Sequence, residues 1–212
     1  MATPTSSGSI TILSPSDLTG INYIDSLAAG TKWGGGLGTS VSLTYSFGGS
    51  GSVYSTDSIT GYGPSNGSGE PWNGWSAFSS TQITATNNAL STWAEVANVT
   101  FTQVTDSSTV AGELRFAESN IASPTAFAYY PWASAYAGDV WFSDDPVYDT
   151  SEKGTYGYLT YLHEIGHALG LKHPHDTDGS GVVTASSTDY TAYTVMSYKS
   201  YEGAAVNAGV WC

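Results

Sequence analysis

The sequence of 212 residues has very few cysteines and very few cations. Its single cysteine is the last residue, Cys212, so an intrachain disulfide and a zinc or redox site built on cysteine are both excluded. Only 5 Lys and Arg stand against 18 Asp and Glu, which gives a net charge of −13. Because binding to phosphates needs clustered cations, this balance argues against nucleic-acid binding and against docking on an anionic membrane.

Long hydrophobic runs are also absent. No stretch approaches the roughly 18 apolar residues of a membrane span, and residues 1–30 lack the basic and apolar regions of a Sec-type signal peptide. Yet 40% hydrophobic and 13% aromatic residues are too many for a disordered chain. The length suits one domain, which we place at 33–212, preceded by a loosely structured N-terminal segment at 1–32.

Hydrophobic periodicity gives the order of the elements. Alternating apolar and polar residues predict short strands at 41–47, 99–104, 113–116, 125–130 and 139–142. Apolar residues at helical spacing predict two helices, at about 79–97 and 155–169. Gly, Ser and Pro predict a long loop at 48–75, and residues 172–212 are expected to be mostly irregular.

The second predicted helix carries the motif with the clearest chemistry, His163-Glu164-Ile165-Gly166-His167, followed by Gly170 and His173. Two histidines four residues apart lie on one face of a helix, where their imidazoles can share a zinc ion. Glu164 directly follows His163, so its side chain leaves the helix beside the two histidines, close enough to reach a metal-bound water without being a ligand. Gly170 can adopt the left-handed conformation that ends a helix, so the chain can return His173 as a third nitrogen.

Downstream, residues 193–198 (Tyr-Thr-Val-Met-Ser-Tyr) supply the Met-turn that accompanies the extended histidine motif. Together the two motifs resemble the metzincin zinc peptidases. In detail, His-Glu-Ile-Gly-His-Ala-Leu-Gly-Leu-x-His-Pro and Val-Met-Ser-Tyr resemble the serralysin branch. Residues 43–47 and 93–101 resemble that family's first strand and first helix, so the resemblance covers about 33–200. It implies an α+β metzincin-type domain with a twisted mixed sheet, an active-site helix and an irregular C-terminal subdomain.

The resemblance also implies a secreted zinc-dependent endopeptidase with one catalytic Zn2+ ion. Three side chains would bind the metal: His163, His167 and His173. Glu164 would be the catalytic base, and Met196 would form the floor beneath the metal. Tyr198 would be an additional, displaceable zinc ligand that hydrogen-bonds the developing oxyanion. The edge strand that binds an extended substrate would comprise Ala126, Phe127, Ala128 and Tyr129.

Several alternatives stay open. His175 is a candidate fourth ligand, although a solvated loop side chain is the simpler interpretation because three histidines already fill the ligand positions. Residues 176–181 resemble half of a calcium loop, so Ca2+ is retained as an alternative cofactor. They lack the third carboxylate and the bidentate Glu, which favours a plain Asp/Gly turn. The runner-up function is a secreted binding or adhesion module with a structural or vestigial zinc site, in which Glu164 would have no use.

The sequence departs from the family at its C-terminal end. Family members continue into a helix after the Met-turn, a calcium-binding β-roll and a C-terminal export signal, so the catalytic domain at 33–212 is expected to be truncated. We expect protein or peptide substrates, no nucleic acid, no membrane, a monomeric state and an inhibitor protein as a candidate partner. An extracellular location is implied by the resemblance alone, and a pro-segment role for residues 1–32 is left open.

Overall fold

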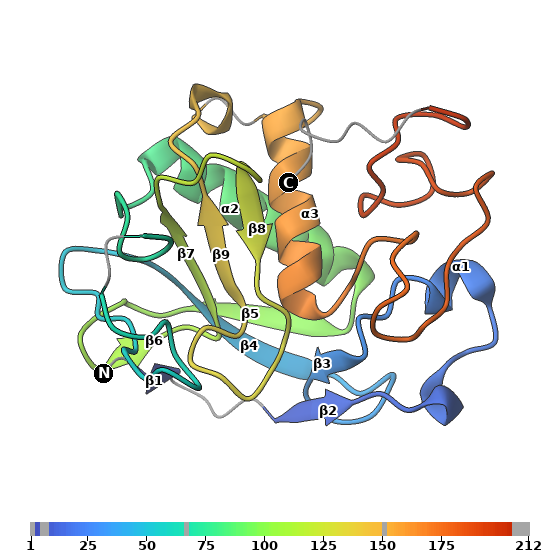
Figure 1. Cartoon of the computed structure of the whole chain (residues 1–212), viewed down its shortest axis with the longest axis horizontal. Helices are drawn as coiled ribbons and strands as arrows, with labels where there is room; N and C mark the ends of the chain where they lie inside the picture. Colours follow the sequence, from blue (N-terminus) through green and yellow to red (C-terminus); the bar gives the residue numbers. More distant parts are fainter. Residues whose placement is uncertain (1–2, 5–8, 66–67, 150–151, 205–212) are drawn as a thin grey trace.

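The computed structural model describes residues 3–4, 9–65, 68–149 and 152–204, so Cys212 lies outside the described residues. Its centre is a five-stranded sheet with the order β5-β4-β7-β9-β8, on which two long helices pack (Figure 1). The described residues contain no helix that is both long enough and apolar enough to cross a membrane. The expected α+β domain with a mixed sheet is therefore confirmed.

All five predicted strands are present in the sheet. Four of them run parallel to one another: β4 (Val41–Phe47), β5 (Val99–Gln103), β7 (Leu114–Glu118) and β9 (Asp139–Phe142). The fifth, β8 (Ala126–Ala128), pairs antiparallel with β9 and forms one edge of the sheet. This edge strand lies beside the second long helix, which makes it the part of the sheet nearest to the histidine motif (Figure 1).

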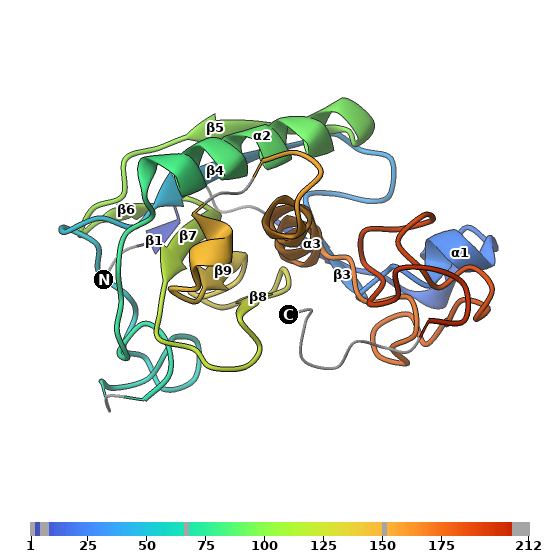
Figure 2. The ribbon, with the colours of Figure 1, turned by 90° about the horizontal axis from the view of Figure 1, so that it is seen from above.

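Both predicted helices are also confirmed, and they pack on the same face of the sheet. α2 (Ser80–Val96) begins at a capping box in which the Ser79 hydroxyl accepts from the Gln82 amide. α3 (Tyr156–Leu169) lies against α2, as Figure 2 shows with α3 seen nearly end-on. Ala89 and Ile165 from the helices meet Phe116 of the sheet in one fully buried core.

The other face of the sheet is covered by aromatic residues of the predicted loop. Trp141, on the face opposite to Phe142, packs on Tyr54 and Tyr62. Tyr62 in turn contacts Tyr129 and Tyr136, which lie at the two ends of the connection between β8 and β9. This layer therefore supports the connection that leaves the edge strand next to α3.

The remaining elements are short. β1 (Thr3–Pro4) pairs with β6 (Val110–Ala111), and a short helix, η2 (Pro146–Tyr148), follows β9. In the N-terminal segment β2 (Ile10–Ile12) pairs with β3 (Thr31–Trp33), and η1 (Pro15–Asp17) and α1 (Asn22–Asp25) lie between these two strands. This segment packs on the chain that leaves α3: the Ala29 amide donates to Gly170 at 3.0 Å, and the Lys172 amide donates to Leu27 at 2.8 Å. The predicted domain boundary at residue 33 stays a prediction.

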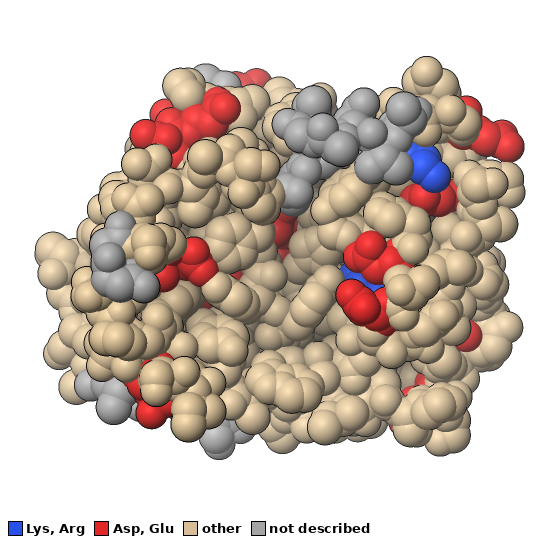
Figure 3. Space-filling view, in the orientation of Figure 1, with Lys and Arg blue, Asp and Glu red and all other residues tan. Residues whose placement is uncertain are grey.

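The chain after α3 is irregular, as expected. Between Gly170 and Ala204 the structure has no helix and no strand, only turns and one isolated bridge between Ala28 and Leu171. In Figure 1 this segment, coloured orange to red, lies on the far side of α3 from the sheet. Figure 3 shows the surface hollowed in the middle of this face, over the C-terminal half of α3.

Candidate metal centre

The helix α3 begins and ends where its sequence requires. The Thr155 hydroxyl caps its first turn by accepting from the Tyr158 amide at 3.2 Å. At the other end Gly170 has a φ of 107°, the left-handed conformation expected from the sequence. A side chain there would also collide with the carbonyl oxygen of Thr31, because β3 passes close to this turn. Only glycine satisfies both constraints, and the turn then directs the chain back toward the helix.

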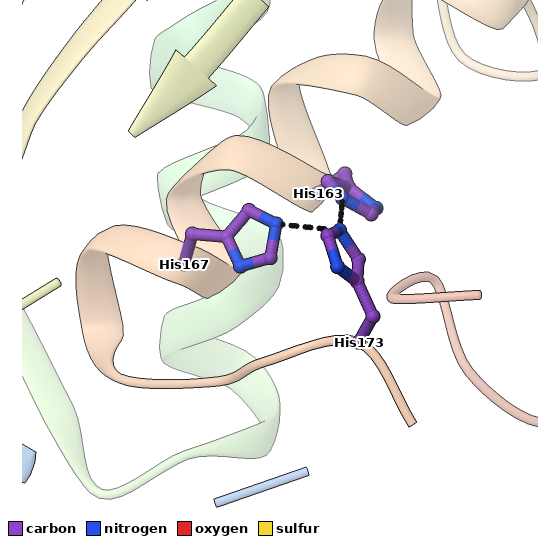
Figure 4. A group of neighbouring side chains, drawn as sticks. All are labelled: His163, His167 and His173. Atoms are coloured by element: carbon purple, nitrogen blue, oxygen red, sulfur yellow. Dashed lines mark hydrogen bonds between the residues drawn. The ribbon is translucent and has the colours of Figure 1, made fainter. Parts of the chain in front are cut away.

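The three predicted histidines meet at one point (Figure 4). His163 Nε2 lies 3.2 Å from His173 Nε2, and His167 Nε2 lies 3.0 Å from the same atom. His163 and His167 are buried on α3, and His173 approaches from the returning chain with partial exposure. The i, i+4 spacing and the helix-ending glycine thus assemble the trio that the sequence predicts.

Each imidazole is fixed by its other nitrogen. The Nδ1 atoms lie 2.7 Å from three acceptors: the Val195 carbonyl for His163, the Leu171 carbonyl for His167 and the Asp176 carboxylate for His173. Because carbonyl and carboxylate oxygens only accept, each Nδ1 carries the proton and donates it. The three converging Nε2 atoms therefore carry no hydrogen, and each presents a lone pair to the others.

The three imidazoles stay neutral near neutral pH, because their surroundings lower the pKa of each. Burial lowers the pKa of His163 to about 4, with a further contribution from His173. Burial and both neighbouring imidazoles hold the pKa of His167 well below its ordinary value, and burial also lowers the pKa of His173 despite Asp176 beside it. Three neutral imidazole nitrogens that face one point match the ligand set of a catalytic zinc site, so the residues fit a zinc ion.

The remaining predicted residues surround this trio. Glu164 is fully buried on α3, next in sequence to His163. The Tyr198 ring centroid lies 4.1 Å from that of His173 and 5.8 Å from that of His163. Met196 is fully buried, and its sulfur packs so closely on Gly166 that a Cβ there would be 2.5 Å away. The structure brings these side chains together, while their roles stay predictions.

His175 stands beside the trio rather than in it. Its ring is nearly parallel to that of His173, with centroids 5.5 Å apart, and its Nδ1 lies 3.5 Å from an Asp189 carboxylate oxygen. His173, His175 and Asp176 form a second group of closely spaced ligand atoms. Since the first trio engages His173 Nε2 and Asp176 holds His173 Nδ1, the geometry favours His163, His167 and His173 as the metal ligands.

The predicted substrate strand lies at the sheet edge, with its side chains divided between two faces. Ala126 is fully buried in the core below α3, while Phe127 and Ala128 are half-buried. The Tyr129 hydroxyl donates to Glu70, and its ring packs on Tyr136. Within the described chain no strand pairs with the outer edge of β8, and the role of this edge in substrate binding stays a prediction.

Three residues near the centre were missed by the sequence analysis. Asp176 was interpreted as part of a plain turn, although its place three residues after His173 is a signal for a supporting carboxylate. Tyr130 lies edge-on to His167 with ring centroids 5.5 Å apart, and no local pattern indicates this. Lys172 is buried, and a cation between the apolar run of α3 and His173 was a signal that its charge is used.

The fold and the centre define a class: a zinc metallopeptidase domain of the metzincin type. Comparison with known families agrees, since the family model of the matrixin peptidases matches residues 75–192. The chain belongs to this family, and its catalytic domain is serralysin-like.

Several proteins similar in sequence to this chain are named serralysins. The serralysin of Photorhabdus sp. (strain Az29) is 36% identical over 140 residues, which covers 60% of this chain and 29% of the relative. The serralysin of Proteus mirabilis is 37% identical over 143 residues, covering 57% of this chain and 29% of the relative. Serralysin G of Dickeya chrysanthemi is 36% identical over 155 residues, covering 68% and 29%. The chain thus spans less than a third of the length of these relatives.

Proposed function

We propose that this chain is a secreted zinc-dependent endopeptidase that binds one zinc ion through His163, His167 and His173. The observation that carries the proposal is the convergence of three unprotonated Nε2 atoms: those of His163 and His167 lie 3.2 and 3.0 Å from that of His173, and each ring is held by a hydrogen bond from its Nδ1. A bound zinc ion supplies Lewis acidity toward a peptide carbonyl and toward water.

The chain's own residues provide the proton transfers. Glu164, buried beside the trio, accepts a proton from the attacking water and delivers it to the leaving amine. Tyr198, whose ring lies against His173, would be an additional, displaceable ligand of the metal, and its hydroxyl would donate a hydrogen bond to the developing oxyanion. Met196 supports the trio from below, since its sulfur packs on Gly166 between the two helical histidines.

The substrate is a protein or peptide in an extended conformation. Its main chain pairs with the outer edge of β8, because a strand with no neighbour on one side offers unpaired N–H and C=O groups in register. The chain acts as a monomer outside the cell, and an inhibitor protein is a candidate partner. Family membership supports an extracellular location, which fractionation of the producing cells tests.

The test combines metal analysis with hydrolysis. Purified protein should contain one zinc ion per chain and should cleave an unstructured protein such as casein until a chelator is added. Glu164→Ala should keep its zinc and lose about 10²–10⁴-fold in turnover, whereas Glu95→Ala, an exposed carboxylate on α2, should match the wild type. A protein that holds zinc but cleaves nothing would favour the alternative, a binding or adhesion module with a structural metal.

A further inference from the structure

A pocket of about 300 Å³ opens beside the metal centre, where the chain leaves the edge strand. Its lining comes from the connection after β8 and from the N-terminal segment: Ala29, Thr31, Tyr129, Tyr130, Trp132 and Tyr136. We call it the aromatic pocket. Tyr130 joins it to the centre, because its ring lies edge-on to His167 at 5.5 Å. The same connection passes the C-terminal end of α3 in Figure 1.

The lining is aromatic and carries no charged side chain. Trp132 is 54% exposed and Tyr130 is 38% exposed, so two large rings leave apolar surface to solvent at this point. Burial, assisted by the carboxylates of Asp176, Glu164 and Asp178, raises the pKa of Tyr130 to about 12, so the phenol stays neutral. Exposed aromatic surface of this kind, beside a reaction centre, is typical of a binding pocket.

Two of the lining residues, Tyr129 and Tyr136, are held in place by packing. Tyr129 and Tyr136 pack ring against ring at 4.7 Å, and both contact Tyr62 on the layer behind the sheet. Main-chain bonds close the connection at its base, with the Tyr129 amide donating to Asp139 and the Gly138 amide donating to Tyr129, each at 3.0 Å. The pocket is therefore formed before a ligand arrives.

We propose that the aromatic pocket binds a large apolar or aromatic side chain of the substrate, upstream of the bond that is cleaved. The proposal rests on the endopeptidase function proposed above. Antiparallel pairing is the more stable arrangement per residue, so a substrate strand runs opposite to β8. The pocket lies at the C-terminal end of β8, where an antiparallel substrate places its N-terminal part.

The apolar lining selects among substrates. A hydrophobic pocket discriminates large from small side chains by about 10- to 200-fold in kcat/KM. Carboxylates that act on Tyr130 further disfavour an acidic side chain at this position. Because the pocket is occupied in both ground state and transition state, its loss should raise KM and leave kcat nearly unchanged.

Cleavage of a peptide library, profiled position by position, tests the proposal. The wild type should prefer Phe, Tyr, Trp or Leu over Ala at one position within three residues upstream of the cleaved bond. Trp132→Ala should lose about 10-fold or more of this preference through KM, and Trp132→Phe should restore most of it. Because Trp132 is 54% exposed, folding should be unaffected. Tyr201→Ala, a change at an exposed tyrosine outside the lining, is the matched control.

A second measurement separates binding from turnover. Fluorescently labelled peptides with Phe, Ala, Asp or Arg at the preferred position are titrated into Glu164→Ala and into the double variant with Trp132→Ala. The Phe peptide should bind Glu164→Ala most tightly, and the double variant should remove that advantage. A preference for Arg, a preference that lies downstream of the cleaved bond, or an unchanged profile in Trp132→Ala would each overturn the proposal. Absence of any hydrolysis by the wild type would instead refute the endopeptidase function.

Discussion

The helix α3 and the irregular chain that follows it serve the same centre by different means. His163, Glu164 and His167 all lie on one helix, whose main-chain hydrogen bonds are made within the helix itself. His173, Met196 and Tyr198 stand on a chain without helix or strand, whose main chain must find partners elsewhere. A helix therefore fixes its ligands through local geometry, while the loop fixes them through contacts across the fold.

Buried charges provide much of the support on the loop side. The Lys172 ammonium donates to the carbonyls of Ser26 at 2.6 Å, Asp176 at 2.7 Å and Val182 at 2.9 Å, which joins the N-terminal segment to two points of the loop after α3. Asp189 accepts from the Ser197 hydroxyl and from the Lys199 ammonium, each at 2.7 Å, beside the Met-turn. The loop half of the centre therefore depends on side chains that are not among the predicted metal ligands.

The largest expected effect is the loss of zinc when one histidine ligand is removed, either from the helix or from the loop. His167→Ala on the helix and His173→Ala on the loop should both lose stoichiometric zinc, since two nitrogens remain of the three that fit the ion. The loss of zinc affinity should exceed the roughly 10–100-fold that an outer partner of a ligand contributes. Zinc titration against a chelating indicator measures it. His175→Ala should bind zinc like the wild type, and equal losses for His173→Ala and His175→Ala would contradict the assignment of the third ligand.

The next effect concerns Tyr198 on the loop. A phenol has an ordinary pKa of about 10, so a nearby cation is what makes it a ligand at neutral pH. Tyr198→Phe should keep zinc, because three histidines suffice, and should lose on the order of 10- to 10³-fold in kcat. Steady-state kinetics with a peptide substrate separate kcat from KM.

Tyr193 and Tyr201 are exposed tyrosines nearby in sequence and serve as controls. If Tyr198→Phe behaves like Tyr201→Phe, or if its defect lies wholly in KM, the tyrosine has no role in the transition state. The helix and its three histidines would then account for the whole centre.

A smaller effect is expected at Asp176, which holds His173 but does not reach the metal. Asp176→Ala removes the acceptor 2.7 Å from His173 Nδ1, so zinc affinity should fall by about 10–100-fold. Asp176→Asn should recover most of the affinity, because its amide oxygen still accepts from the imidazole. Asp178→Ala is the matched control. Unchanged zinc affinity in Asp176→Ala would show that the returning chain alone positions His173.

The same contrast explains how much of the molecule could be predicted from its sequence. The strands and α3 were predicted because alternation and i, i+4 spacing are local properties of the chain. The contact of Tyr130 with His167 could not be predicted, since it joins the end of the edge strand to α3. Lys172 was equally hidden, because its partners Ser26 and Val182 come from either side of α3 in the sequence.

The smallest effect concerns the buried carboxylate of Asp189 on the loop and the dependence of stability on pH. Burial acts to raise the pKa of Asp189, but hydrogen bonds from Lys199 and Ser197 outweigh it, with His175 assisting, and hold the pKa below its ordinary value of 3.8. A carboxyl with a lowered pKa contributes stability above its ordinary pKa, and this contribution is lost as pH falls through the folded-state pKa. Asp189→Asn keeps the shape and loses the charge opposite Lys199, so it should lower the free energy of unfolding at pH 7 by about 1 kcal/mol.

Urea unfolding of wild type and Asp189→Asn, both with chelator so that metal release does not contribute, measures the difference in stability. That difference should be full at pH 7 and pH 5, should begin to shrink near the ordinary pKa of 3.8, where the unfolded chain takes up its proton, and should be lost as pH falls through the lower folded-state pKa. Asp144→Asn, at an exposed carboxylate after β9, should show little difference at any pH. A difference that stays constant or grows toward low pH would mean that the hydrogen bond from Ser197 alone stabilises this part of the loop. The charge of Lys199 would then have no part in holding the Met-turn beside α3.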